Sequence, residues 1–392
     1  MAVKTPIYMD YQATTPLDPR VLDAMMPYLT DRFGNPHSVG HRFGWEAEAG
    51  VDKARGDVAT LIGAAPEDIV FTSGATETNN LVLKGVMAAY GAKRDHLVTV
   101  VTEHKCVLEA AASVARAGFQ VTLLPVGGDG LIDLDRLADS LTDRTALVSV
   151  MTVNNEIGVI QPVARIGALC RERGVLFHTD AAQAFGKLPL DVADQNIDLI
   201  SISGHKIHGP KGIGALYMRR RPRIRLVPQM DGGGQEGGIR SGTLSPALCA
   251  GLGAAASIAG AEMARDGEHV ARLMGRFRSK LVDVLPGVVV NGHTEQRYSG
   301  NLNLSFPGLD GELLIANLRD LAVSSGAACA SATTGPSYVL EAIGVPEELA
   351  AASIRFGIGR FTTEAEVDFA AGRVIETVAQ MGGLSAAPEL AS

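Results

Sequence analysis

Short apolar runs alternate with longer amphipathic segments over much of the chain before residue 220. The runs are rich in Val, Ile and Leu, which is typical of buried strands. Between them, Val107–Ala117 and Val163–Arg173 carry apolar residues at helical spacing. This alternation predicts an α/β fold, with a mostly parallel seven-stranded sheet covered by helices on both faces. The predicted strands are Asp68–Ser73, Leu97–Val101, Val121–Pro125, Ala146–Met151, Val175–Thr179, Leu199–Ser203 and Ile213–Tyr217.

The pattern changes near residue 262. A long helix is expected over Glu262–Leu285, followed by strands near Val288–Asn291 and Asn301–Phe306, a further helix and a loop. These elements indicate a smaller α+β domain. Because 392 residues exceed one typical core, we predict three parts. They are an N-terminal arm packing on the small domain (1–20), a large domain (21–261) and a small C-terminal domain (262–392).

Composition and charge limit the classes of function. The chain has 46% hydrophobic residues, 20% charged residues and a net charge of −8. This argues against a protein that binds nucleic acid or an anionic membrane. The basic run Arg219–Arg225 is best explained as a solvated connection after a strand. No metal site is predicted.

The sequence also favours a cytoplasmic location. The N-terminus has no signal-peptide pattern. The Ala- and Gly-rich run Leu244–Ala264 fits a buried helix better than a membrane span. The four cysteines are widely spaced and form no C-x-x-C motif, as expected in a reducing compartment.

A lysine at the end of a predicted strand is the strongest candidate for chemistry. Lys206 follows Leu199–Ser203 and is surrounded by glycine, two histidines and a Gly-Pro turn. A lysine placed in this way can approach an aldehyde cofactor and form a Schiff base. The alternative is a basic, glycine-rich loop that only closes a turn. The polar residues that follow other predicted strands favour the cofactor.

One of these polar segments suits a phosphate group. Ser73-Gly-Ala-Thr76 stands between a strand and a helix. Gly74 and Ala75 allow backbone N–H groups to approach an anion, and Thr76 adds a hydroxyl. The helix N-terminus would stabilise the anion by roughly 0.3–2 kcal/mol. A plain N-cap is the alternative. The segment matches neither a Walker A loop nor a dinucleotide fingerprint.

Further polar side chains follow three other strands. Asp180 ends one apolar run and would keep a pyridine nitrogen protonated. Gln183 and Asn155 offer amides to a ring oxygen, and His104 offers an imidazole that stacks on a ring and moves protons. Helix capping by Asp180 and a structural role for His104 are the alternatives. Ligands of parallel sheets bind at the carboxyl ends of the strands, where these residues lie.

A cysteine lies in a second distinctive segment. Val323–Tyr338 is rich in small and turn-forming residues, which predicts an exposed loop around Cys329. A thiol there can attack a sulfur atom held by the cofactor, provided that a base or cation helps it ionise. Packing as a small hydrophobic residue is the alternative, and it is expected for Cys170 and Cys249. The helical setting of Cys106 also favours packing.

Several motifs together resemble the cysteine desulfurases, the NifS/IscS-like branch of the class V aminotransferases. The resemblance extends from about Tyr8 to Ala370 and implies a fold-type I architecture dependent on pyridoxal 5'-phosphate. It also implies conversion of L-cysteine to L-alanine, with transfer of sulfur to an enzyme cysteine persulfide and then to an acceptor protein. The motifs are Tyr8–Pro16, Ser73–Glu77, His178–Gln183, Ser203–Gly212, Arg240–Thr243 and Ser324–Cys329.

The resemblance assigns expected roles to individual residues. Lys206 would carry the cofactor, His104 would stack on its ring as acid and base, and Cys329 would accept the sulfur. The remaining expected contacts are Asp180 with the ring nitrogen, Asn155 and Gln183 with the ring oxygen, Ala75, Thr76, Ser203 and His205 with the phosphate, Thr243 with the phosphate of the partner subunit in a homodimer, and Arg355 with Asn155 at the substrate.

Two other functions stay open from the sequence. One is a different pyridoxal-phosphate enzyme, such as a selenocysteine lyase. The other is a sulfur-trafficking scaffold with weak catalysis. The chain after about Met381 is short and rich in Ala and Pro. It leaves open whether sulfur goes to iron–sulfur clusters, modified tRNA or modified DNA.

Overall fold

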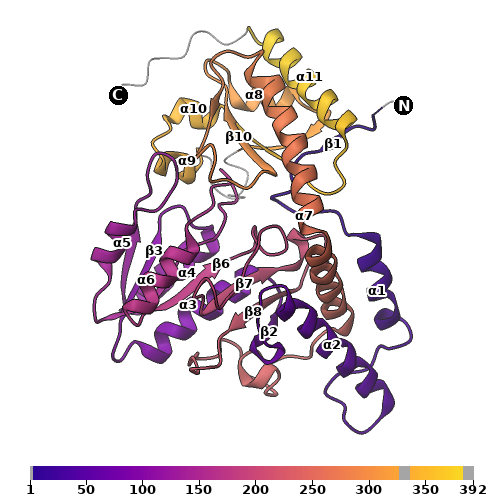
Figure 1. Cartoon of the computed structure of the whole chain (residues 1–392), viewed down its shortest axis with the longest axis vertical. Helices are drawn as coiled ribbons and strands as arrows, with labels where there is room; N and C mark the ends of the chain where they lie inside the picture. The colour runs from indigo at the N-terminus through magenta and orange to yellow at the C-terminus, as the bar shows by residue number, and fades with distance from the viewer. Residues whose placement is uncertain (1–2, 326–335, 383–392) are drawn as a thin grey trace.

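The computed structural model describes residues 3–325 and 336–382. Its larger part is built on a seven-stranded sheet in the order β2-β8-β7-β6-β5-β3-β4 (Figure 1). All neighbours pair in parallel except β8, which is antiparallel to both β2 and β7. The predicted fold class is confirmed. The strands are β2 Ile69–Thr72, β3 His96–Val100, β4 Gln120–Leu124, β5 Thr145–Ser149, β6 Leu176–Asp180, β7 Leu199–Ser203 and β8 Gly214–Met218.

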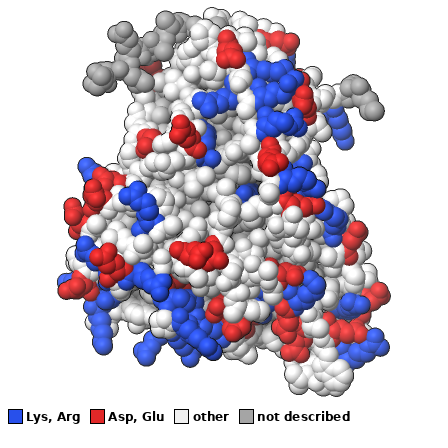
Figure 2. All heavy atoms as spheres, in the orientation of Figure 1, with Lys and Arg blue, Asp and Glu red and all other residues white. Residues whose placement is uncertain are grey.

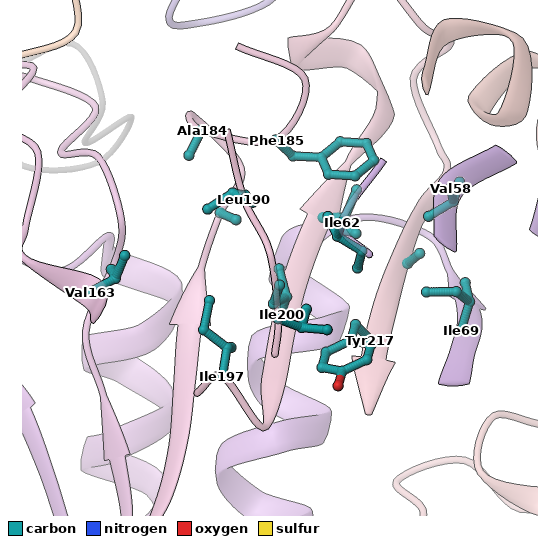
Figure 3. Close-up of a cluster of buried hydrophobic side chains, with 14 of the residues drawn as sticks. Val58, Ile62, Ile69, Val163, Ala184, Phe185, Leu190, Ile197, Ile200 and Tyr217 are labelled. Atoms are coloured by element: carbon teal, nitrogen blue, oxygen red, sulfur yellow. The ribbon is translucent and has the colours of Figure 1, made fainter. Parts of the chain in front are cut away.

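Successive residues of each strand point to opposite faces of the sheet, and both faces are covered by helices. On one face Phe71 and Ile200 pack with α2 and α6. Figure 3 shows part of this core around Ile200, Phe185 and Tyr217. On the other face Val70 and Leu199 pack with α3 and α4. The helices are α1 Pro19–Leu29, α2 Arg42–Thr60, α3 Ala75–Tyr90, α4 Lys105–Arg116, α5 Leu134–Ser140 and α6 Val163–Glu172, with short 3-10 turns at η1 Pro66–Asp68, η2 Gly204–Lys206 and η3 Glu236–Gly238.

The smaller part has its own core and an antiparallel sheet in the order β12-β13-β10-β9. The N-terminal strand β1 (Ile7–Tyr8) pairs in parallel with β11, so Ile7 and Met9 are buried in this second core. The other elements are α7 Pro246–Val282, β9 Val289–Val290, β10 Asn301–Ser305, α8 Gly311–Asn317, β11 Leu321–Ala322, β12 Ser324–Ser325, α9 Tyr338–Ala342, α10 Glu347–Ala351, β13 Ser353–Gly357 and α11 Glu364–Gln380.

Helix α7 joins the two parts as one continuous helix of 37 residues. The sequence predicted a helix starting at Glu262, but α7 begins at Pro246 because no helix breaker separates the two apolar segments. The predicted domain boundary at 261/262 falls inside it. Within the described residues, α7 is the one helix long and apolar enough to cross a membrane. Its residues Leu252 and Phe277 are instead buried in the two cores.

Candidate active site

A cavity of about 640 Å³ lies where β3, β5, β6 and β7 end, beside the N-terminus of α3. It gathers residues from distant parts of the chain because the carboxyl ends of parallel strands meet at one edge of the sheet. The predicted site residues that line it are Ala75, Thr76, His104, Asn155, Asp180, Gln183, Ser203, His205 and Lys206.

Lys206 stands directly after β7, at the end of the short turn η2. Its Nζ donates hydrogen bonds to the carbonyl oxygens of Gln12, at 2.5 Å, and Ala13, at 2.8 Å. The N-terminal arm therefore forms one wall of the cavity, which the sequence did not predict. The backbone folds tightly here, because a side chain at Gly209 would lie 2.8 Å from the Gly204 carbonyl oxygen.

Asp180 ends β6 and is only 4% exposed. Its Oδ1 accepts a hydrogen bond from the Ala182 N–H at 2.9 Å, and its Oδ2 accepts one from Asn79 Nδ2 at 2.7 Å. The carboxylate therefore stabilises the following turn and also lines the cavity, so the capping alternative and the cavity position are compatible. The contact with Asn79 could not be read from the sequence, because the two residues are 101 positions apart.

His104 caps the N-terminus of α4, where its Nδ1 accepts a hydrogen bond from the Cys106 N–H at 3.2 Å. The Cys106 sulfur lies 3.0 Å from the same nitrogen. Burial lowers the pKa of His104, while Asp180 raises it and Lys206 lowers it further. The helical pattern predicted that Cys106 would pack as a small hydrophobic residue. It does pack against the core beneath α3 and α4, and it also lines the cavity, which the pattern did not predict.

One end of the cavity is suited to an anion. Gly74 is the N-cap of α3, with φ of 149°, and no atom lies within 4 Å of the position of a side chain there. The cavity is open above the helix N-terminus, where unpaired N–H groups attract negative charge. Lys211 lines the same cavity. Burial lowers the pKa of His205 to about 4, with further lowering by Lys206 and Lys211.

Two predicted residues in the described part of the chain, Arg355 and Thr243, are not among those that line this cavity, and a third prediction falls outside that part. Arg355 is buried in β13, where it donates to the Asn155 carbonyl at 2.9 Å and to Asp10 at 2.7 Å. It thereby links the smaller sheet to the loop after β5. Thr243 is exposed on the surface. Cys329 lies outside the described residues, after strand β12.

The sequence analysis also missed a second lysine near the cavity. Lys187 donates to Gln183 Oε1 at 3.2 Å, and Gln183 Nε2 donates to the Gln12 carbonyl at 2.8 Å. The Gln12 carbonyl is the same oxygen that accepts from Lys206. Burial and the charge of Lys206 lower the pKa of Lys187 to about 7. The sequence does place Lys187 four residues after Gln183, but many surface lysines stand four residues from a polar residue, so this spacing alone could not identify it.

Comparison with known proteins assigns the family. The sequence profile of the class V aminotransferases matches residues 7–369. This chain belongs to that family. Within this class V aminotransferase family it is similar to the cysteine desulfurase IscS of Rickettsia bellii, with 59% identity over 97% of this chain and 93% of the relative. The chain is thus a member of the NifS/IscS-like branch.

Solved structures agree with this branch of the class V aminotransferases. A NifS-like protein superposes with a TM-score of 0.89 at 34% identity, covering 95% of this chain and 99% of the other. SspA in complex with cysteine superposes with a TM-score of 0.82 at 38% identity, covering 91% and 99%. Enzymes of the family use pyridoxal 5'-phosphate, and the cavity fits it. It has an anion cradle at α3, a carboxylate at Asp180 and an amine at Lys206.

Proposed function

We propose that this class V aminotransferase is a cysteine desulfurase. It converts L-cysteine to L-alanine and passes the sulfur to Cys329, and then to an acceptor protein. The observation that carries the proposal is that Lys206, Asp180 and His104, from the ends of three strands, line one cavity beside a helix N-terminus. This arrangement brings together an amine, a carboxylate and an imidazole around a space of about 640 Å³.

Bound pyridoxal phosphate supplies an aldehyde that links to an amine and a ring that withdraws electrons from the substrate. Lys206 would hold the aldehyde carbon, and Asp180 would keep the ring nitrogen protonated. The N-terminus of α3 would bind the phosphate through backbone N–H groups. The other proposed contacts are Ala75, Thr76, Ser203 and His205 with the phosphate, and Asn155 and Gln183 with the ring oxygen.

Protons move between the substrate and two side chains. Lys206 Nζ accepts and returns a proton, and the imidazole of His104 gives one up and takes it back. Burial lowers the pKa of His104 and keeps the ring neutral, so that it has an N–H to give and can regain that proton afterwards. The thiolate of Cys329 bonds to the substrate sulfur as the bond between that sulfur and the substrate Cβ breaks. The carbon keeps the electron pair, takes a proton and leaves as alanine, while Cys329 carries a persulfide.

Arg355 is proposed to bind the substrate carboxylate together with Asn155. Its guanidinium is already oriented by Asp10 and by the Asn155 carbonyl. A guanidinium fixed in this way loses little side-chain entropy when it binds a carboxylate through two hydrogen bonds. Strand β12, which precedes the segment of Cys329, pairs with Arg355 through Ser324.

We also propose that the enzyme is a cytoplasmic homodimer. Exposed large apolar side chains lie on α1, on the connection to α2 and on the first turn of α2, and such a group of side chains is typical of a protein–protein interface. Thr243, which is proposed to reach the phosphate of the partner subunit, is exposed as well. Light scattering of the purified enzyme should give twice the mass of one chain, and a monomer would contradict the proposal. The exposed apolar side chains are Leu22, Met26, Leu29, Phe33, Val39, Phe43 and Trp45.

Two variants test the desulfurase function. Lys206→Ala should lose the visible absorption of the lysine-linked cofactor and all alanine formation. Cys329→Ser should keep that absorption but release neither alanine nor sulfide from L-cysteine. Cys170→Ser is the matched control, because Cys170 is buried in the core away from the cavity.

The outcomes separate the alternatives. Alanine formation by Cys329→Ser at the native rate would refute the role of this thiol. A visible band that persists in Lys206→Ala would refute the lysine assignment. Faster alanine formation from L-selenocysteine than from L-cysteine would indicate a selenocysteine lyase. A stable partner in pull-downs together with negligible turnover would indicate a scaffold.

A further inference from the structure

A chain of hydrogen bonds connects Asp180 to His104 through Asn79 and Cys106. The Nδ2 group of Asn79 donates to Asp180 Oδ2 at 2.7 Å and to Cys106 Sγ at 3.1 Å. The Cys106 sulfur then lies 3.0 Å from His104 Nδ1. Asn79 is fully buried, so its amide cannot exchange these partners for water. The contacts therefore join the two residues proposed to meet the cofactor ring at its nitrogen and its face.

The donor and the acceptor of each hydrogen bond between Asp180 and His104 can be assigned. The Cys106 backbone N–H donates to His104 Nδ1 at 3.2 Å, so this nitrogen acts as an acceptor and carries no proton. The only proton left for the Cys106–His104 contact is that of the thiol. The sulfur can donate it to Nδ1 while accepting from Asn79. A neutral His104 then carries its own proton on Nε2.

A cysteine beside a histidine has a second interpretation, a nucleophilic thiolate–imidazolium pair. The surroundings of Cys106 oppose it. Burial raises the pKa of the Cys106 thiol to about 12, and the negative charge of Asp180 raises it too, whereas hydrogen bonds from Asn79 and Thr76 lower it. Burial also lowers the pKa of His104. Both changes favour the neutral pair, because two new charges would be formed in a partly buried site.

We propose that Cys106 is a positioning residue that donates its thiol proton to His104 Nδ1, while Asn79 orients the sulfur and links it to Asp180. The contact holds the imidazole as the tautomer protonated on Nε2 and leaves that nitrogen for proton exchange in the cavity. Cys106 is thus not a second sulfur acceptor. The consequence for catalysis rests on the proposed function. The assignment of the His104 tautomer is independent of that function.

Infrared spectroscopy of the cofactor-loaded enzyme tests the thiol directly. Subtracting the spectrum of Cys106→Ser from that of the native enzyme isolates the S–H stretch of Cys106. The band should be present and should lie at lower frequency than the band isolated with Cys170→Ser, since donation weakens the S–H bond. A missing band would show a thiolate, and an unshifted band would show a thiol that donates nothing. Either result overturns the proposal.

Nitrogen NMR of histidine-labelled holoenzyme tests which ring nitrogen of His104 carries the proton. The variant His104→Gln assigns the signals. The native enzyme and Cys106→Ser should both show a protonated Nε2 and a hydrogen-bonded, unprotonated Nδ1. In Cys106→Ala the Nδ1 signal should move toward that of an acceptor with one donor fewer. The turnover number should fall about tenfold at unchanged KM, the size of one hydrogen bond.

These measurements distinguish this proposal from the proposed function. A native Nδ1 that carries a proton, or a Cys106→Ala spectrum identical to the native one, would overturn the positioning role even in an active desulfurase. If the enzyme released no alanine, the infrared and NMR results would still decide the state of Cys106 and His104.

Discussion

Two groups of titratable side chains in this protein behave in opposite ways. In and beside the cavity, burial suppresses the charge of several groups. It lowers the pKa of His205 to about 4 and of Lys187 to about 7, and it raises the pKa of Glu103 well above its usual range. At the junction of α1, α7 and the loop before α11, the pKa of Asp18 falls because Arg20 and Arg360 bind its carboxylate. We call this junction group the ion cluster; it consists of Asp18, Arg20, Glu262, Asp266 and Arg360.

The difference follows from the partners of each group. Arg360 is 8% exposed and contacts Asp18 at 2.9 Å and Asp266 at 2.6 Å, so its buried positive charge lies between two negative charges. Lys187 lies beside the Tyr298 ring and the Gln183 amide, and it forms no ion pair with a carboxylate in the part of the chain that the structure describes. Figure 2 shows that positive and negative side chains also lie side by side over α7 and α11. Paired charges therefore hold elements together, whereas burial in and beside the cavity favours the neutral forms of His205 and Glu103.

The largest effect is expected when Asp180, the cavity carboxylate proposed to meet the ring nitrogen, is replaced by a neutral amide. Asp180→Asn keeps the shape of the side chain and an oxygen for the Ala182 N–H, but it removes the negative charge. Turnover of L-cysteine should fall about 10²–10³-fold, as for other preorganised electrostatic groups. The melting temperature should change little. Near-native turnover would show that Asp180 has only its capping role.

Breaking the ion cluster should affect stability and leave the chemistry intact. Arg360→Met leaves Asp18 with only the half-exposed Arg20 and Asp266 with only the exposed Arg265, and the free energy of unfolding should fall by about 3 kcal/mol. Urea unfolding measures it. Arg272→Ala is the matched control, because this arginine is 57% exposed and pairs with an exposed Glu364. It should cost less than about 1 kcal/mol. An equal loss of unfolding free energy in the two variants would show that the buried ion cluster stabilises the protein no more than an exposed ion pair does.

The smallest effect should appear as a dependence of stability on pH. The pKa of Lys187 is lowered from 10.5 to about 7 in the folded protein, so the unfolded chain binds more protons between these values. Its contribution therefore makes the free energy of unfolding rise with pH across this window. Lys187→Met should flatten the rise, which urea titrations near both ends of the window would measure. Lys211→Met, at an exposed lysine, should leave it unchanged.

The local pattern of apolar and polar residues was sufficient to predict the strands of the large sheet and the position of Lys206 after β7. Each of these features depends on neighbours in the sequence. A buried strand needs a continuous apolar run, and the residue that follows it must lie at the sheet edge. The same argument placed Asp180 and His104 at the ends of β6 and β3. The family motifs added roles to these residues but did not change their positions.

Only the tertiary structure decided which distant groups meet in the site. Arg355 pairs with Asp10 across 345 positions, and Lys206 contacts the Gln12 carbonyl across 194. Cys106 has the spacing of a packed helical residue, yet its sulfur also contacts His104 and accepts a hydrogen bond from Asn79 of α3. Such contacts depend on how helices pack over the sheet. The periodicity of one segment does not determine which other segments lie next to it in space. The charge state of each buried group follows from that packing.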